Sequence, residues 1–501
     1  MSHSTHKLKP EVRLYLPAGL NQNELSTILT GAPGNYSASK KVCLLYSYLI
    51  SRGFNQEKAT DFGANWTQVN SKVLRVIFGG SYNKWVNLLL KSKYLERLNE
   101  DPKTGKVSTR GFYRTPQNRD GGQSKQYRIP AWLLSNKGGL NFTISNQSLG
   151  KTELKKLHAL RAPKRSYARD QYRQHIEKMM QELILVDTPD SRRAIANLQL
   201  QKALQGTPEQ FLEVFNHGAM NEVLVDEFGW RVHSKITNTS KHLRPFLRFA
   251  NDQLSALVEI DFATSQPSIL ASLTPDLIRQ FAPDCAEAIP LLEALQNEPS
   301  FQKFQHYCLE EDIYAYLASR WNATYPEEPL TRTQAKNIFF RAAYSNYQYL
   351  GRLDVIKLNA KARSFAASGS LSAAMQEAAS RNAKSLRAVR SYHLFKSEFV
   401  AVHDFFAALK QLEWSGFNPS KRGCHTNNCL LAQRIESGLI YECLVKAVME
   451  AGISQVVTIH DSLLVREADE PRVRAIIECE LASLGVRLRL GPSKLGQGEV
   501  V

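Results

Sequence analysis

The segment TRTQAKNIFFRAAYSN (331–346) places two cations and two aromatic side chains at intervals of four residues: Arg332, Lys336, Phe340 and Tyr344. Residues four apart lie on one stripe of an α-helix, so all four are expected to face the same way. Such a stripe makes a poor core but suits a nucleotide, because cations bind phosphates and aromatic rings stack on a base. The alternative is a solvent-exposed face with two half-buried rings.

Two further segments place a carboxylate next to a predicted strand. In ALVEIDFATSQPSILASL (256–273) an apolar run leads to Asp261. In QVVTIHDSLLVRE (455–467) two apolar runs flank His460 and Asp461, which predicts a hairpin with an aspartate in its turn. The aspartates are 200 positions apart, so only the fold can bring them together. Taken singly, each segment also fits a buried strand with a structural aspartate.

The order of the three segments resembles the palm and fingers of the family A DNA polymerases and of the single-subunit phage-type RNA polymerases. Two more segments agree with it: EEDIYAYLASRW (310–321), which contains Asp312, and LLAQRIESGLIYECLVKA (430–447), which contains Gln433. The resemblance covers about residues 231–501. It implies an α+β right hand, in which a palm with an antiparallel sheet carries helical fingers and a thumb.

This resemblance implies template-directed nucleotidyl transfer with two Mg²⁺ ions, or Mn²⁺ in their place. Asp261 and Asp461 would hold the metal ions, and Lys336 would take part in catalysis beside them. The residues expected to contact the incoming nucleotide are Arg332, Lys336, Phe340, Tyr344 and Gln266. The residues expected at the primer and template are Gln433, His460, Arg231 and His233.

Three positions depart from the DNA polymerase pattern. Ser462 follows His-Asp where DNA polymerases usually have Glu, as in the phage-type RNA polymerases, and Ser345 replaces a usual Gly. Gln266 stands where DNA polymerases have an acidic side chain that blocks a 2′-hydroxyl. Because a glutamine amide can still hydrogen-bond a tyrosine hydroxyl, we expect Gln266 and Tyr344 to close the sugar pocket and to favour dNTPs.

The leading hypothesis is a DNA-dependent DNA polymerase acting in DNA replication on a primer–template with dNTPs, and RNA is a further candidate partner. No Asp-x-Glu constellation before residue 230 indicates a proofreading exonuclease. Such a compact enzyme suits a phage, plasmid or mobile element. Two alternatives stay open: an RNA polymerase or primase, which Ser462 favours, and a winged-helix replication initiator or regulator with an inactive palm.

The net charge of +17 is carried by the first half of the 501 residues. Residues 1–250 hold 38 basic and 19 acidic side chains, whereas residues 251–501 hold 26 and 28. This asymmetry predicts a polyanionic partner for the front of the chain. The length predicts roughly three domains. We expect a polar, irregular tail at 1–35, a nucleic-acid-binding domain at 36–135, a basic helical connector or thumb at 136–230, and the polymerase domain at 231–501.

Residues 36–135 resemble a winged helix-turn-helix. Helices are expected at 41–51, from 59 onward and at 81–98, before a polar Gly-rich stretch and the strand QYRIP (126–130). A recognition helix over 81–93 would enter the major groove, with Lys84, Lys91 and Lys93 on phosphates. The alternative is a helical domain that contacts protein.

Composition excludes several classes of protein. A hydrophobic content of 43% excludes a wholly disordered chain. The sequence contains no run of 18 apolar residues, so it predicts no transmembrane helix. The first residues lack the apolar core of a signal peptide, and seven irregularly spaced cysteines do not form a disulfide framework. We therefore expect a cytoplasmic protein with no membrane partner.

Two side-chain groups are expected to be structural. Cys424, His425 and Cys429 lack the second ligand pair that a zinc site needs. Glu259 precedes Asp261 by two residues and is more often a partner within the sheet than a metal ligand.

Overall fold

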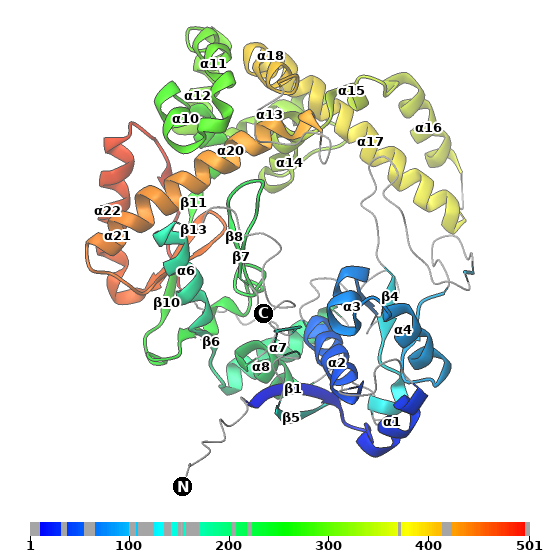
Figure 1. The fold of residues 1–501 in the computed structure, drawn as a ribbon. Helices are drawn as coiled ribbons and strands as arrows, with labels where there is room; N and C mark the ends of the chain where they lie inside the picture. The colour runs from blue at the N-terminus through cyan, green and yellow to red at the C-terminus, as the bar shows by residue number, and fades with distance from the viewer. Residues whose placement is uncertain are drawn as a thin grey trace.

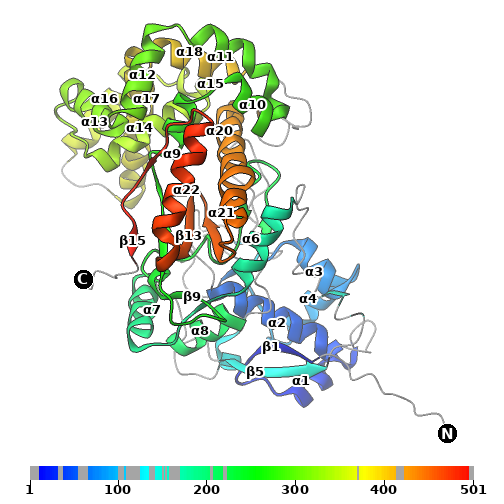
Figure 2. The same cartoon turned by 90° about the vertical axis from the view of Figure 1, so that its left-hand side faces the viewer.

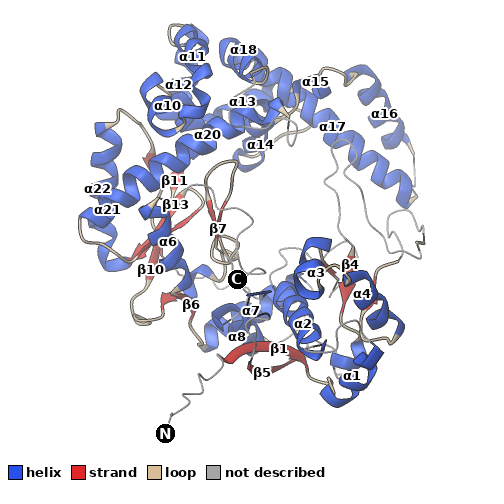
Figure 3. Cartoon of the chain, viewed as in Figure 1, coloured by secondary structure: helices blue, strands red, loops and turns tan. Residues whose placement is uncertain are grey.

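The computed structural model describes residues 11–31, 38–54, 66–99, 107–108, 125–134, 142–148, 152, 155–156, 170–202, 207–217, 223–368, 372–412 and 423–495. The fold is α+β: helices predominate, and every strand pairing among these residues is antiparallel (Figure 3). Buried apolar side chains form one continuous cluster from Leu14 to Val486. None of the described helices is both long and apolar enough to cross a membrane.

The largest sheet in the described chain has four strands in the order β12-β13-β10-β15. Its strands are β10 (Leu257–Ile260), β12 (Val456–Ile459), β13 (Ser462–Arg466) and β15 (Lys494–Leu495). The short pair β11 (Phe262–Ala263) and β14 (Arg489–Leu490) continues from it. All residues of β12 are buried, as expected for a continuous apolar run. Beside the sheet lie α20 (Asn427–Gly438), a π-helical segment (Leu439–Val445), α21 (Lys446–Glu450) and α22 (Glu470–Ser483) (Figure 2).

A helical layer stands above this sheet in both views (Figures 1 and 2). It begins with α9 (Ser265–Ala271), α10 (Pro275–Phe281), α11 (Ile289–Leu295), α12 (Pro299–Leu309) and α13 (Ile313–Thr324). It continues with α14 (Arg332–Tyr344), α15 (Tyr347–Leu350), α16 (Val355–Ala367), α17 (Ala373–Glu398) and α18 (Val400–Leu409). The rings of Phe304, Phe339 and Phe395 meet at its centre, with centroids 6.2 to 6.4 Å apart. These contacts tie α12, α14 and α17 together.

A separate unit at the front of the chain lies at the opposite end of the molecule from this layer (Figure 1). It contains α2 (Ala38–Phe54), β2 (Thr67–Gln68), α3 (Ser71–Phe78), α4 (Tyr82–Lys91), β3 (Glu96–Arg97) and β4 (Gln126–Arg128). The three strands pair in the order β2-β4-β3. In the chain, β2 lies between α2 and α3, and the antiparallel pair β3–β4 follows α4.

The front unit differs from expectation at its edges. Residues 11–31, expected to be irregular, contain β1 (Glu11–Pro17) and α1 (Gln22–Ile28). β1 pairs with β5 (Phe142–Ser148), so both lie outside the expected range of 36–135 and yet belong together. Leu14 and Leu16 are buried in this pairing, which stabilises β1. The partner strand is more than 100 residues away, so the residues near β1 do not indicate it.

Two helices of this unit also have other bounds than expected. α3 begins at Ser71, after the Asn70 side chain accepts the Lys72 backbone N–H, and residues 59–65 lie outside the described part. α4 ends at Lys91, since Lys93 takes a left-handed backbone with φ of 62° that no helix continues through.

The connecting region crosses the expected boundary at residue 230. It contains α6 (Gln171–Gln181), β6 (Leu183–Leu185), α7 (Pro189–Lys202), α8 (Pro208–His217), β7 (Leu224–Val225), β8 (Val232–His233) and β9 (Leu247–Phe249). β6 pairs with β9, and β7 pairs with β8. Segments on both sides of residue 230 are therefore joined by strand pairing.

Candidate active site

The two predicted aspartates lie at one edge of the four-stranded sheet. Asp261 directly follows β10, whose Ile260 is paired with Leu463 of β13. Asp461 directly precedes β13, so the antiparallel register places it next to Asp261. Both side chains are half-buried. The fold thus joins two carboxylates that are remote in the sequence.

The turn that carries Asp461 has only two residues, because Ile459 and Ser462 form the last strand pair. Its first residue, His460, has a left-handed backbone with φ of 57°. Two-residue hairpins favour positive φ because their twist then matches the strands, and a non-glycine residue there costs roughly 1 kcal/mol or more. The paired, buried strands on both sides hold this strained turn and with it the position of Asp461.

The electrostatics of this edge favour a cation. Burial raises the pKa of Asp461, and the neighbouring Asp261 carboxylate raises it further, while Arg231 acts in the opposite direction. Burial also lowers the pKa of His460, to which the Arg231 charge adds, so its imidazole is neutral at pH 7. A positive ion between the carboxylates would relieve their repulsion.

Arg231 and His233 reach this edge, as predicted, and each is held by a protein carboxylate. Arg231 forms an ion pair with the buried Glu436, whose other oxygen accepts the Ser265 hydroxyl at 2.8 Å. His233 Nε2 lies 2.8 Å from Asp226 Oδ2, and its ring centroid is 6.3 Å from that of His460. Both residues therefore have fixed positions beside the hairpin turn.

The predicted stripe is present on α14. Arg332 and Lys336 are exposed, whereas Phe340 and Tyr344 are half-buried. The helix begins with a capping box between Thr331 and Gln334, which satisfies its first backbone N–H groups. The Lys336 ammonium lies 5.6 Å from the centre of the Phe340 ring.

Two residues of the preceding helix segment face this stripe. Asp312 caps α13 and accepts a hydrogen bond from Arg332 Nε at 2.6 Å. The ring of Tyr314 lies 5.5 Å from the Arg332 guanidinium and 5.9 Å from the Lys336 ammonium. Burial raises the pKa of Tyr314, and the charge of Asp461 adds a smaller contribution in the same direction. The Asp312-Ile313-Tyr314 segment resembles a polymerase motif, but no role for Tyr314 was predicted from it.

The expected contact between Gln266 and Tyr344 is present. The Tyr344 hydroxyl donates to Gln266 Oε1 at 2.8 Å and so joins α9 to the end of α14. Burial raises the pKa of Tyr344 well above its usual value, so this hydroxyl keeps the proton that it donates. Gln266 lies five residues after Asp261 in the chain.

Glu259 has a structural role. Arg244 Nη1 donates to its two carboxylate oxygens at 2.8 and 2.9 Å, and the Ser462 hydroxyl donates to Oε1 at 2.8 Å. Its charge is therefore committed within the sheet. Ser462, where DNA polymerases usually have a free acidic residue, is thereby tied to a carboxylate on the neighbouring strand.

Gln433 lies beside the segment that carries Arg231. Its Nε2 is 3.1 Å from Cys429 Sγ, and its side chain covers Gly229, where a Cβ atom would come within 2.4 Å of Gln433 Oε1. Gly229 is thus required for this approach. The glutamine is half-buried on α20.

No group of three or more His, Cys, Asp or Glu side chains in the described part of the chain is arranged to hold a metal ion. A pair of carboxylates remains sufficient for Mg²⁺, which commonly takes one or two of them and fills its other positions with water and substrate phosphates.

Helix α4, which carries two of the three predicted lysines, lies apart from β10 and β13 (Figure 1). Lys84 and Lys91 are exposed on α4, whose opposite face buries Trp85 and Leu89. Lys93 is exposed just beyond the helix. Their spacing of seven puts Lys84 and Lys91 on the same solvent face.

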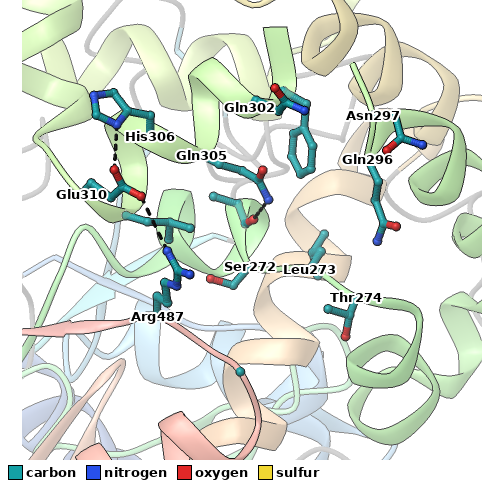
Figure 4. A pocket seen from close by; sticks show the side chains of 14 residues that line it. Ser272, Leu273, Thr274, Gln296, Asn297, Gln302, Gln305, His306, Glu310 and Arg487 are labelled. Carbon is teal, nitrogen blue, oxygen red and sulfur yellow. Dashed lines mark hydrogen bonds and ion pairs between the residues drawn. The ribbon is translucent and has the colours of Figure 1, made fainter. Parts of the chain in front are cut away.

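A cavity of about 560 Å³ lies beyond the far end of α9, apart from all of these residues (Figure 4). Its wall includes His306, Glu310 and Arg487, in which His306 Nδ1 lies 2.9 Å from Glu310 Oε2. Gln305 Nε2 donates to the Ala271 carbonyl at 2.9 Å. None of the site residues predicted from the sequence lines this cavity.

Comparison with known proteins adds no assignment: no protein-family model matches the chain, and no curated protein is significantly similar to it.

Proposed function

We propose that this chain is a template-directed nucleotidyltransferase, and specifically a DNA-dependent DNA polymerase without proofreading. The observation that carries the proposal is the position of Asp261 and Asp461 on neighbouring strands of one sheet edge. The α14 stripe supports it, because Tyr314 lies beside the two cations of that stripe and the charge of Asp461 contributes to its raised pKa.

The two carboxylates fit magnesium ions. They are adjacent and half-buried. Burial raises the pKa of Asp461 and the Asp261 charge raises it further, and a divalent cation would offset both effects. When bound, a pair of such ions would supply activation of a 3′-hydroxyl and stabilisation of the leaving pyrophosphate. Mn²⁺ has the same preference for oxygen ligands.

The remaining groups would bind and orient the nucleotide. Lys336 lies exposed beside the rings of Phe340 and Tyr314, where it would neutralise triphosphate charge. Arg332 is paired with Asp312 at an exposed position, and such a pair contributes only about 0–1 kcal/mol, so a phosphate can replace the carboxylate. Gln266 and Tyr344 would close the sugar pocket against a 2′-hydroxyl.

Extension of a labelled primer on a DNA template tests this function. Asp461→Ala should lower the rate at least about a thousandfold, since removal of a metal ligand takes away several kcal/mol of charge stabilisation. Asp276→Ala is the matched control, because that carboxylate is 90% exposed on α10 and away from the sheet. Extension by Asp461→Ala at the wild-type rate would refute the assignment.

A single-subunit RNA polymerase or primase is the second candidate. Ser462 favours it, since this residue follows His-Asp in the phage-type RNA polymerases that the chain resembles. The same extension assay separates the two candidates when dNTPs and rNTPs are supplied in parallel. Efficient extension with rNTPs and weak extension with dNTPs would establish the second candidate.

We also propose that the front unit binds DNA through α4. Lys84 and Lys91 share its solvent face, and α3 and α4 are joined by the short Gly79-Gly80 turn. This arrangement is that of a helix-turn-helix, in which the second helix enters the major groove.

A further inference from the structure

A basic arm extends from the helical layer shortly after α14. We define the arm as residues 352–390, which comprise α16 and the first two thirds of α17. It holds eight Lys or Arg and two Asp or Glu, whereas the rest of residues 251–501 holds 18 and 26. The arm is thus a strongly basic segment in an otherwise acidic half of the chain, and it stands at the outer edge of the layer, away from β10 and β13 (Figures 1 and 2).

The cations at the base of the arm are neutralised within the protein. Arg387 Nε donates to Glu328 Oε1 at 2.7 Å, and Arg390 Nη1 lies 3.1 Å from Glu327 Oε1. These glutamates precede α14, so the pairs brace the arm against the helix that carries the nucleotide-binding stripe. Asn382, which is buried, also donates to the Leu358 carbonyl at 2.9 Å and fastens α16 to α17.

Three exposed cations of α16 and α17, which together we call the tip of the arm, have a different environment. Lys361, Arg363 and Lys384 are exposed, and no carboxylate of the described residues forms an ion pair with them. Lys357, one helical turn before Lys361, lies 3.5 Å from Asp354 and is compensated by that carboxylate. α16 buries none of its side chains, and Ile356 is 79% exposed. The tip therefore concentrates positive charge that no described carboxylate neutralises.

We propose that the tip of the arm, through Lys361, Arg363 and Lys384, binds the phosphate backbone of the nucleic acid on which the site acts. This inference rests on the proposed function for the identity of that nucleic acid. The charge supports it, because cations exposed on a braced scaffold release counterions when they meet phosphates. Single and double strands offer the same phosphate chemistry, so the experiment must distinguish them. An acidic protein partner is the competing occupant.

Fluorescence anisotropy of labelled DNA bound to the full chain tests the arm. The probes are a primer–template with a long overhang, a blunt duplex and a single strand, titrated at salt from about 50 to about 200 mM. The arm variant is Lys361→Gln/Arg363→Gln/Lys384→Gln. Its control, Arg279→Gln/Lys446→Gln/Arg472→Gln, removes the same charge from exposed positions on α10, α21 and α22.

The binding constant K falls as salt rises, and each phosphate contact contributes roughly 0.7 to 0.9 to the steepness of log K against log salt. We expect this slope to be shallower by about two in the arm variant. A loss on the overhang and single-strand probes alone would assign the tip to an unpaired strand, and a loss on all three probes would assign it to either form. A slope equal to that of the control on every probe would overturn the inference and leave an acidic protein as the occupant.

Primer extension separates this result from the proposed function. At saturating DNA the arm variant should extend primers within about twofold of wild type, because α16 and α17 lie apart from β10 and β13, the strands next to the two aspartates (Figure 1). If the wild type binds DNA with an arm-dependent slope but extends no primer, the arm inference holds and the polymerase proposal fails. If primers are extended and the arm variant leaves the slope unchanged, the polymerase proposal holds and the arm inference fails.

Discussion

Helices α14 and α16 are both 13 residues long and lie only ten residues apart in the chain, yet they treat their cations differently. α14 buries five apolar side chains and holds Arg332 and Lys336 next to Asp312 and the ring of Tyr314. α16 buries none and leaves Lys361 and Arg363 in solvent. A cation in a shaped site can act on one defined group, whereas a cation on a bare surface contributes mainly long-range attraction.

Removal of one lysine charge from each helix is the test with the largest expected effect. Lys336→Gln should lower kcat/KM for the nucleotide about a hundredfold, because a positioned cation on transferring phosphate contributes that order of stabilisation. Lys361→Gln, the matched lysine on α16, should leave kcat/KM unchanged and weaken DNA binding. Steady-state kinetics with dNTPs measure the first effect. An equal loss of kcat/KM in the two variants would show that the α14 lysine acts no more specifically on the nucleotide than the α16 lysine does.

A second test sharpens what the shaped site recognises. Gln266→Ala removes the acceptor of the Tyr344 hydroxyl and opens the space beside the sugar. We expect the preference for dNTPs over rNTPs to fall about tenfold, which corresponds to about 1.4 kcal/mol. Competition between the two nucleotide types in single-nucleotide extension gives this ratio. Gln266→Glu is the control that keeps the size of the side chain, and it should preserve the preference.

The smallest expected effect concerns a buried cation beneath α14. Lys410 is 6% exposed and its Nζ donates to the Ala343 carbonyl at 2.5 Å. Burial lowers the pKa of this amine from 10.5 to about 7. The unfolded chain then binds more protons between these values, so stability should rise with pH, by about 1 kcal/mol from pH 7 to pH 8.

Urea unfolding at the two pH values measures this gain. Lys410→Met keeps the apolar stem and removes the titrating group, so it should abolish the part of the gain that Lys410 contributes. Lys384→Met on the exposed arm is the matched control and should leave the pH dependence as it is in the wild type. A gain that persists in Lys410→Met would place its origin elsewhere.

The sequence predicted the parts of the candidate site that depend on local geometry. The four-residue spacing of Arg332, Lys336, Phe340 and Tyr344 sets one helical stripe, and the structure has that stripe. The bond between Gln266 and Tyr344 followed from the size and chemistry of an amide. The role of Tyr314 was missed, because nothing in its own segment indicates that α13 packs against α14.

The expected organisation of the front of the chain was less successful for the same reason. β1 was taken for part of an irregular tail, and its partner β5 lies in another predicted region. The apolar residues of β1 are consistent with a strand, but strand preference depends on context and the sequence does not show which distant segment will pair with it. The boundary at residue 230 is likewise crossed by the pairs β6–β9 and β7–β8.

Features that depend on neighbours a few residues away can be predicted from the sequence: the helical stripe of α14, the apolar strands and the tight turn around His460 and Asp461. Contacts between distant segments emerge from packing: Asp261 lies beside Asp461, Arg244 and Ser462 hydrogen-bond to Glu259, and the cations of α16 stay in solvent. The reason is physical. Helix periodicity and turn geometry arise from local backbone sterics, whereas strand partners and the burial of charges are chosen by how distant apolar surfaces pack.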